Sequence, residues 1–363
     1  MKRKKILVVI AAILVLTTLL AACGNNNTTS TGTGTTSSSD NNAPTNNVEP
    51  VSSSDTPEFK WKITIPGKSG SLCNSPTYIA YEKGFFAEEG IDVELITADF
   101  EAKKVGLNNG TIATINGDFQ YFPSIEGDIQ MTVVEGLHQG CIKLNVLGDS
   151  DIQTAEDLRG KTIAVDEIGG TPYQVALLWL GQAGVSANEV TFLPFNDGNL
   201  EVEALRQGQV DVAALWDPIG TTSVEAYGLR TILDISKDEP FAGHYCCFLY
   251  ASTKVIEEDP ELIAAELRAY HRAQAWIAEN PEEAVELVTS KQYVSIEDHD
   301  VALELIKSYC YPTEADHHGG KVDVQADVEY FAQALYDIGY LHTEPAEFAA
   351  RAYTYIDLSL GQN

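Results

Sequence analysis

Residues 61–97 read WKITIPGKSGSLCNSPTYIAYEKGFFAEEGIDVELIT, and this stretch decides the fold class. Its first five residues read as a strand, and the Gly/Ser-rich loop 66–74 follows. Ser75 and Pro76 then supply an N-cap and a first-turn proline for a helix. Residues 91–97 make the next strand. This order of strand, loop, helix and strand predicts an α/β protein with largely parallel sheets.

The same alternation continues along the chain. Thr154 to Asp157 reads as a capping box, and Thr171-Pro172 caps the helix that follows a glycine-bearing loop. From Asp259-Pro260 the chain is predicted to be helical to about Ile356. Further strands are predicted at 111–115, 161–165, 190–195, 210–216 and 230–235, and helices at 101–109, 173–183 and 200–207. Each strand-loop-helix unit points backbone N–H groups at the carboxyl end of a sheet, where a small polar ligand can be held.

Length and charge limit the possible functions. The chain has 363 residues, 53 acidic and 23 basic, and a formal net charge of −30. Such acidity argues against nucleic acid as a partner. The folded part from residue 57 onward is more than one core usually supports, so it suits two lobes. The sequence has no linker-like stretch between them, and ordered crossovers with a cleft are therefore expected.

The N-terminus has the pattern of an export signal. Basic residues 2–5 precede the apolar run 6–20, which is about 15 residues long, short of the roughly 20 needed to cross a bilayer. The run ends in LAACG, which resembles the lipobox of bacterial lipoproteins, and a secretory signal with an incidental cysteine is the alternative. We expect a signal peptide over 1–22, a lipidated Cys23 and a disordered tether over 23–56. Loss of four basic residues would change the net charge from −30 to −34.

Four segments carry a resemblance to a known family. Residues 76–94 (PTYIAYEKGFFAEEGIDVE) resemble the opening of the nitrate/sulfonate/taurine and thiamine-pyrimidine-precursor class of substrate-binding proteins of ABC transporters. The segments DLRGKTIAV (157–165), ALRQGQVDVA (204–213) with WDP (216–218), and ENPEEA (279–284) match this family in the same order. The resemblance covers about Lys60 to Val288.

This resemblance implies an α/β, type II periplasmic-binding-protein fold, with two lobes, a hinge and a central cleft. Lobe one would comprise 57–145 and 246–363, and lobe two 146–245, with crossovers at 141–147 and 246–251. The protein would close on a small ligand and deliver it to an ABC importer permease, as a monomer lipid-anchored outside the cell membrane and without a cofactor. Carried over by position, the ligand-binding residues are Ser71, Cys73, Asn74, Asn116, Gly117, Asp118, Gly169, Gly170, Thr171, Trp216 and Asp217.

The cysteines and histidines allow two further hypotheses. Besides Cys23 there are five cysteines, an odd number, so at least one is unpaired. A disulfide from Cys141 to Cys246 or Cys247 could join the two crossovers. Alternatively, HQGC (138–141) and HYCC (244–247) place imidazole and thiol together, which suits zinc, copper, iron or a metal chelate. The candidate metal ligands are His138, Cys141, His244, Cys246 and Cys247, and all of these except Cys247 are also candidate ligand-binding residues.

Two other functions, an enzyme and a sensor ectodomain, fit the sequence less well than a binding protein does. Cys246-Cys247-Phe248 resembles the iron motif of the fungal thiamine-pyrimidine synthase, but Leu249 stands where a later cysteine would be, and residues 118–124 lack the Lys and His of that enzyme. The sequence has no nucleophile or metalloprotease motif, so an enzyme is not expected. A sensor ectodomain would need a membrane span.

The ligand stays open at this level. Nitrate or a sulfonate would favour Arg or Lys in the cleft, and the candidate loops offer only Lys68, His138 and Lys143. Helix N-termini can bind an oxyanion without these groups. A neutral heteroaromatic stacked on Tyr173 or Trp216, or a metal species held by the Cys/His set, fits the acidic composition at least as well. His317-His318 beside Asp316 is predicted to be an exposed loop.

Overall fold

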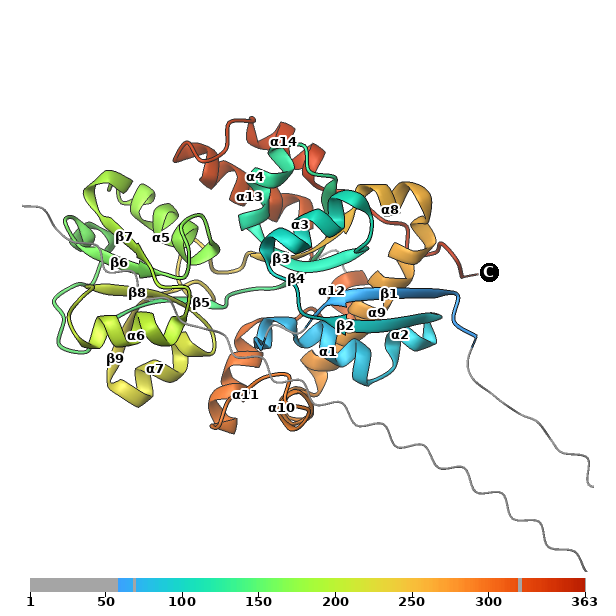
Figure 1. Ribbon diagram of the computed structural model, residues 1–363, viewed down its shortest axis with the longest axis horizontal. Coiled ribbons are helices and arrows are strands. Elements are labelled where there is room, and N and C mark those ends of the chain that lie inside the picture. The colour runs from blue at the N-terminus through green and yellow to red at the C-terminus, as the bar shows by residue number, and fades with distance from the viewer. Residues whose placement is uncertain (1–57, 68–69, 319–321, 363) are drawn as a thin grey trace, which may run out of the picture. The chain divides into compact units, whose positions relative to one another are not determined.

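The computed structural model describes residues 58–67, 70–318 and 322–362, and their helices surround three β-sheets (Figure 1). The predictions for the signal peptide, Cys23, the tether and Lys68 lie outside these residues. None of the described helices has the length and apolarity needed to span a membrane.

Two small sheets build the first lobe. Strand β1 (Trp61–Pro66) pairs in parallel with β2 (Ile91–Ile96). Strand β10 (Cys247–Ser252) lies between β3 (Thr114–Asp118) and β4 (Met131–His138) and runs antiparallel to both. The predicted strand 111–115 is therefore displaced toward the C-terminus, because the ladder with β10 includes Asn116 to Asp118.

A five-stranded sheet builds the second lobe, in the order β7-β6-β8-β5-β9. Its strands are β5 (Ile142–Leu147), β6 (Thr162–Val165), β7 (Thr191–Pro194), β8 (Val212–Trp216) and β9 (Leu229–Asp234). Strand β6 is parallel to β7 and β8, whereas β5 is antiparallel to β8 and β9. Residues 142–145, placed in lobe one by the sequence, pair within this sheet. The sheets are less parallel than predicted because β5 and β10, beside the two crossovers, run against their neighbours.

Helices flank these sheets, and the chain after β10 is almost entirely helical, as predicted. The helix predicted to run toward Phe85 ends at Glu82, because Gly84 adopts a left-handed φ of 76° and starts a new helix. The described helices are α1 (Ser75–Glu82), α2 (Phe85–Glu88), α3 (Phe100–Asn109), α4 (Phe122–Glu126), α5 (Thr171–Gln182), α6 (Gly198–Arg206), α7 (Ile219–Tyr227), α8 (Thr253–Glu258), α9 (Pro260–Glu279), α10 (Pro281–Ser290), α11 (His299–Ser308), α12 (Glu314–His318), α13 (Val324–Asp337) and α14 (Pro345–Ala352).

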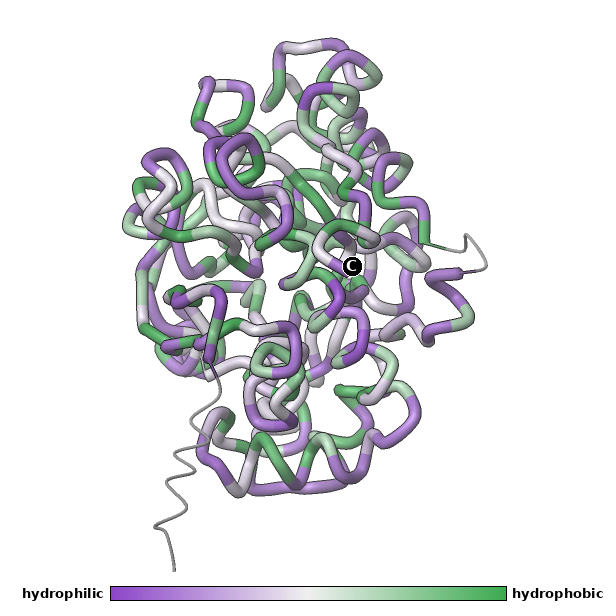
Figure 2. The backbone as a smooth tube through the Cα atoms, turned by 90° about the vertical axis from the view of Figure 1, so that its right-hand side faces the viewer, coloured by the Kyte–Doolittle hydropathy of each residue, from purple (hydrophilic) through white to green (hydrophobic). Residues whose placement is uncertain are grey.

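The core lies in the interior of the molecule, where Figure 2 shows hydrophobic residues concentrated. Along the outer helices, hydrophobic and hydrophilic residues alternate. All of β4 and β10 is buried. Aromatic rings fill the first lobe, with Phe119 stacked on Phe331 at 4.5 Å and Phe122 on Phe248 at 5.9 Å. This packing holds three segments in place: the end of β3, the end of β8 and the loop before α1. All three line one cavity.

Candidate functional site

A cavity of roughly 370 Å³ is lined by residues of both lobes. It brings together eight of the ligand-binding residues expected from the sequence: Ser71, Cys73, Asn74, Asn116, Gly117, Asp118, Trp216 and Asp217. The sequence did not select Gly70, Lys103, Gln120, Tyr121, Pro218 and Ile219, which also line it. Three of the expected ligand-binding residues, Gly169, Gly170 and Thr171, do not line it. Tyr173 does not line it either, and its ring packs edge-on against Phe192.

The first lobe supplies the floor of the cavity. The Asn116 amide donates to the carbonyl oxygen of Cys73 at 2.9 Å and to Oδ1 of Asn74 at 2.8 Å. These bonds hold the loop before α1 against the end of β3. Gly117 is required here because a Cβ would lie 2.6 Å from the Tyr121 ring. The floor therefore combines short polar side chains, two thiols and the Tyr121 ring with the longer side chains of Lys103 and Gln120.

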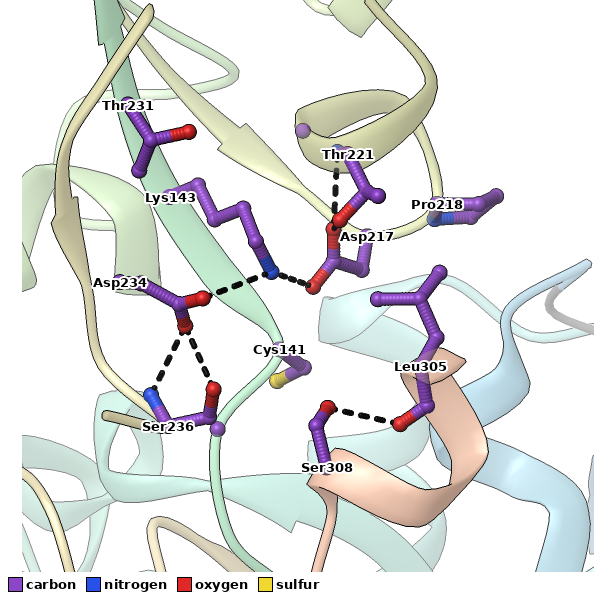
Figure 3. Close-up of polar contacts among 12 residues, drawn as sticks. Cys141, Lys143, Asp217, Pro218, Thr221, Thr231, Asp234, Ser236, Leu305 and Ser308 are labelled. Atoms are coloured by element: carbon purple, nitrogen blue, oxygen red, sulfur yellow. Dashed lines mark hydrogen bonds and ion pairs between the residues drawn. The ribbon is translucent and has the colours of Figure 1, made fainter. Parts of the chain in front are cut away.

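The second lobe supplies the opposite wall, between β8 and α7. Trp216 lines the cavity, and its indole N–H donates to Asp166 at 2.8 Å. The side chain of Asp217 has no exposed surface. Its carboxylate accepts hydrogen bonds from the Lys143 ammonium at 2.6 Å and from the Thr221 hydroxyl at 2.8 Å (Figure 3). Asp217 thus fixes the wall and does not offer a free charge to a ligand.

Lys143 holds two buried carboxylates together in this wall. Its ammonium also lies 3.5 Å from Asp234, which accepts from Ser236 (Figure 3). Desolvation lowers the pKa of Lys143, but the two carboxylates more than offset it, and the net shift is upward. Lys143 therefore stays charged and occupied, and it is not free to bind an anion.

The two lobes touch directly beside the cavity. The Thr171 hydroxyl, at the first residue of α5, donates to the Asp118 carboxylate. The Ser71 hydroxyl lies 3.5 Å from the carbonyl oxygen of Asp217. Burial raises the pKa of Asp118 to about 7, although the hydrogen bond from Thr171 opposes the shift. Asp118 is thus poised to change charge near neutral pH.

Lys103 is the cation that the sequence missed. It lies on α3 and is the only Lys or Arg among the described residues that line the cavity. Desolvation lowers its pKa, and the charges of Asp118 and Asp99 oppose this. The sequence alone does not single out Lys103, because a lysine on a short polar helix normally faces solvent. A signal was available, since α3 directly follows the carboxyl end of β2.

Four cysteines and one histidine gather beside the cavity, and two of the cysteines, Cys73 and Cys247, line it. Cys73, Cys141, Cys246 and Cys247 are buried and free, and His138 is buried beside them. The predicted disulfide is absent, because the Sγ atoms of Cys141 and Cys247 lie 3.6 Å apart, far beyond the roughly 2.05 Å of a disulfide bond.

His244 lies away from these cysteines, despite its place in the sequence beside Cys246. Its Nδ1 lies 2.8 Å from Asp327, and its ring stacks on Tyr330 at 3.7 Å. The structure therefore does not bring His244 together with the other four candidate metal ligands.

A second group of candidate metal ligands lies elsewhere and consists of Glu135, His271 and His317. The prediction of a loop at 317–318 is wrong, since both histidines belong to α12. His318 is exposed as predicted, whereas His317 is partly buried and its ring stacks on His271 at 3.8 Å.

Comparison with known proteins identifies the family and the fold. The family model described as "NMT1/THI5 like" matches residues 74–284. A putative aliphatic sulfonates-binding protein of Bacillus subtilis (strain 168) is 28% identical over 239 residues, which is 62% of this chain and 68% of that protein.

Solved structures share the fold. The alkanesulfonate-binding protein SsuA from Xanthomonas axonopodis pv. citri, bound to MOPS, aligns with a TM-score of 0.63 at 15% identity, over 82% of this chain and 99% of that one. The desulfurization enzyme DSZB aligns with a TM-score of 0.57 at 16% identity, over 80% of this chain and 98% of that one. The two-lobed periplasmic-binding-protein fold predicted from the sequence is thereby confirmed. With more than half of its residues matched by the family model, this chain belongs to the NMT1/THI5-like family.

Proposed function

We propose that this protein captures a small organic anion, of the sulfonate kind, between its two lobes and delivers it to an ABC importer. The observation that carries the proposal is the cavity of roughly 370 Å³ that both lobes line, because a ligand bound there would favour lobe closure. The sulfonate-binding relative and the shared fold support this role.

The charges of the cavity favour an anion. Lys103 supplies one ammonium, and burial raises the pKa of the Asp118 carboxyl to about 7, which weakens its negative charge near neutral pH. The loop 71–74 leads into α1, whose first-turn backbone amides carry a partial positive charge. A neutral heteroaromatic ligand, stacked on Trp216, is the alternative that the same cavity allows.

The cellular setting of the proposal comes from the sequence. A signal peptide over 1–22 and a lipid on Cys23 would place the protein outside the cell membrane, tethered to it and working as a monomer with an importer permease. Relatives described as binding proteins are consistent with this setting.

We propose binding rather than catalysis. The desulfurization enzyme DSZB has the same fold, so an active site on this scaffold is chemically feasible. The distinction is measurable, because a binding protein releases its ligand unchanged. Mass spectrometry of the ligand recovered after prolonged incubation therefore belongs to the binding experiment.

The experiment is calorimetric titration of the full chain with alkanesulfonates, taurine, nitrate, an aminopyrimidine and a flavin. We expect an alkanesulfonate to bind, and Lys103→Met to weaken it tenfold or more, or about 1.4 kcal/mol, because a charge-assisted hydrogen bond is lost. Lys104→Met is the matched control, since Lys104 pairs with Glu101 at 2.7 Å and does not line the cavity. Equal losses in the two variants would contradict the proposed site, and binding of the flavin or aminopyrimidine alone would replace the anion by the heteroaromatic.

A further inference from the structure

The cluster of Cys73, Cys141, Cys246, Cys247 and His138 has no role in the capture of a solute as described above. All five side chains are buried and at most 7% exposed. They come from three separate places: the loop before α1, the crossover between β4 and β5, and the start of β10. Free thiols do not gain stability from crowding together, so their convergence calls for an explanation.

The spacing of the sulfur atoms fits a metal site. Cys141 and Cys247 Sγ lie 3.6 Å apart, and Cys246 and Cys247 Sγ lie 3.9 Å apart. A tetrahedral ion with metal–sulfur bonds of about 2.3 Å holds its sulfurs about 3.8 Å apart. The ligand atoms of Cys73, His138 and Cys141 lie within 4.8 Å of one another, and so do those of Cys141, Cys246 and Cys247. Cys141 belongs to both groups, so the five side chains form one cluster.

The imidazole of His138 is oriented as a metal ligand would be. Nδ1 lies 3.0 Å from the carbonyl oxygen of Gln139, which makes Nδ1 the protonated nitrogen and leaves the lone pair on Nε2. Nε2 is buried and has no hydrogen-bond partner among the described residues. A backbone carbonyl that fixes the other ring nitrogen is the usual outer contact of a metal-bound histidine.

The backbone of the crossover is bent to place Cys141. Gly140 and Cys141 have φ values of 76° and 97°, a region that a cysteine seldom adopts. Gly140 is needed there, because a Cβ would lie 2.5 Å from Ser236. This geometry directs the Cys141 thiol toward the cluster.

We propose that this cluster binds one thiophilic metal ion, Zn²⁺ or Cu⁺, in the wall of the cavity. Thiolate and imidazole are the ligands that both ions prefer. Cys73 and Cys247 also line the cavity, so the ion lies next to the captured solute. It joins the loop before α1 to both crossovers and thereby stiffens the hinge. The inference is independent of which solute the protein carries.

The test uses the full chain, reduced, stripped with a chelator and kept free of oxygen. Separate titrations with Zn²⁺ and with Cu⁺ are followed by native mass spectrometry, which gives the number of ions per chain and distinguishes the two. Co²⁺ replaces Zn²⁺ as a visible probe, since tetrahedral thiolate ligation gives intense absorption bands. We expect one ion per chain, thiolate-to-cobalt bands, and a loss of affinity of tenfold or more in Cys246→Ser and in Cys73→Ser.

Two control variants separate this cluster from other ligands. Cys310→Ser removes an exposed cysteine outside the cluster, and His317→Gln removes a member of the second candidate group. Both should bind the ion as the unmodified chain does. If Cys246→Ser does not fold, the unmodified chain still decides, because in mild denaturant the bound ion should protect at least three of the four cluster thiols from alkylation. The absence of a stoichiometric ion, unchanged binding in both cluster variants, or a disulfide among these cysteines in protein from its host would overturn the proposal.

Discussion

Lys143→Met removes the one cation that two buried carboxylates share. In the unmodified chain Lys143 lies 2.6 Å from Asp217 and 3.5 Å from Asp234, and its side chain is 8% exposed. Methionine keeps the length of the side chain but not the charge. Asp217 then keeps no ion-pair partner among the described residues, and Asp234 keeps only the exposed Lys237.

The two ion-pair distances set the size of the loss in folding free energy. At an effective dielectric of about 20, the attraction is about 6 kcal/mol to Asp217 and about 5 kcal/mol to Asp234. Desolvation of the ammonium offsets much of this gross attraction. The hydrogen bonds from Thr221 and Ser236 remain in the variant. Removing one partner of a buried pair costs about 3–5 kcal/mol, and we expect the lower end, about 3 kcal/mol.

The loss should depend on pH in a defined direction. Burial raises the pKa of Asp217 even beside Lys143, and loss of the ammonium raises it further. A carboxyl whose pKa is higher in the folded protein than in the unfolded chain destabilises the fold as pH rises above its ordinary value. The destabilisation of the variant should therefore be larger at about pH 8 than at about pH 5.

Urea unfolding at these two pH values, followed by tryptophan fluorescence, measures the effect. Lys237→Met is the control, because Lys237 lies 3.5 Å from the same Asp234 but its side chain is 59% exposed, so we expect less than about 1 kcal/mol. A Lys143→Met loss no larger than that of the control, or a loss that does not shrink on acidification, would refute the reasoning.

Two further predictions concern the cavity. Affinity for an anionic solute should rise as pH falls through about 7, because the Asp118 carboxyl becomes neutral there. Asp118→Asn should remove this pH dependence, and calorimetry at several pH values checks it. An unchanged pH profile in the variant would count against the role of Asp118. Gly117→Ala should destabilise the protein by about 1–3 kcal/mol and weaken solute binding, since the new methyl group would lie 2.6 Å from Tyr121. Gly127→Ala, with its nearest neighbour at 3.3 Å, is the control in the same unfolding and titration measurements, and equal effects would show that crowding against Tyr121 is not the cause.

Local signals in the sequence determined the elements and their chemistry. Asp259-Pro260 correctly predicts the cap and start of α9, because capping and proline geometry act within one helical turn. Ser75-Pro76 predicts where α1 begins, but the N-cap is Asn74, and the Ser75 hydroxyl donates to the carbonyl oxygen of Leu72 instead. The order of strands and helices, with the segment that opens at residue 76, was sufficient for the fold class. The loop and strand-end residues near 71–74, 116–118 and 216–217 were selected by position from the family resemblance, since β3 and β8 belong to different sheets and no local signal relates their ends.

Only the tertiary structure decided which of these groups are free to act. Asp217 and Lys143 are separated by 74 residues and neutralise each other in the wall, whereas Lys103 enters the cavity from a helix that looks solvent-exposed in sequence. His244 and His138 each precede a cysteine closely, yet only His138 joins the thiols, because the direction of a side chain depends on the packing of distant segments. A sequence fixes spacing along the chain, but a site depends on distances through space, and these are set when the whole core packs.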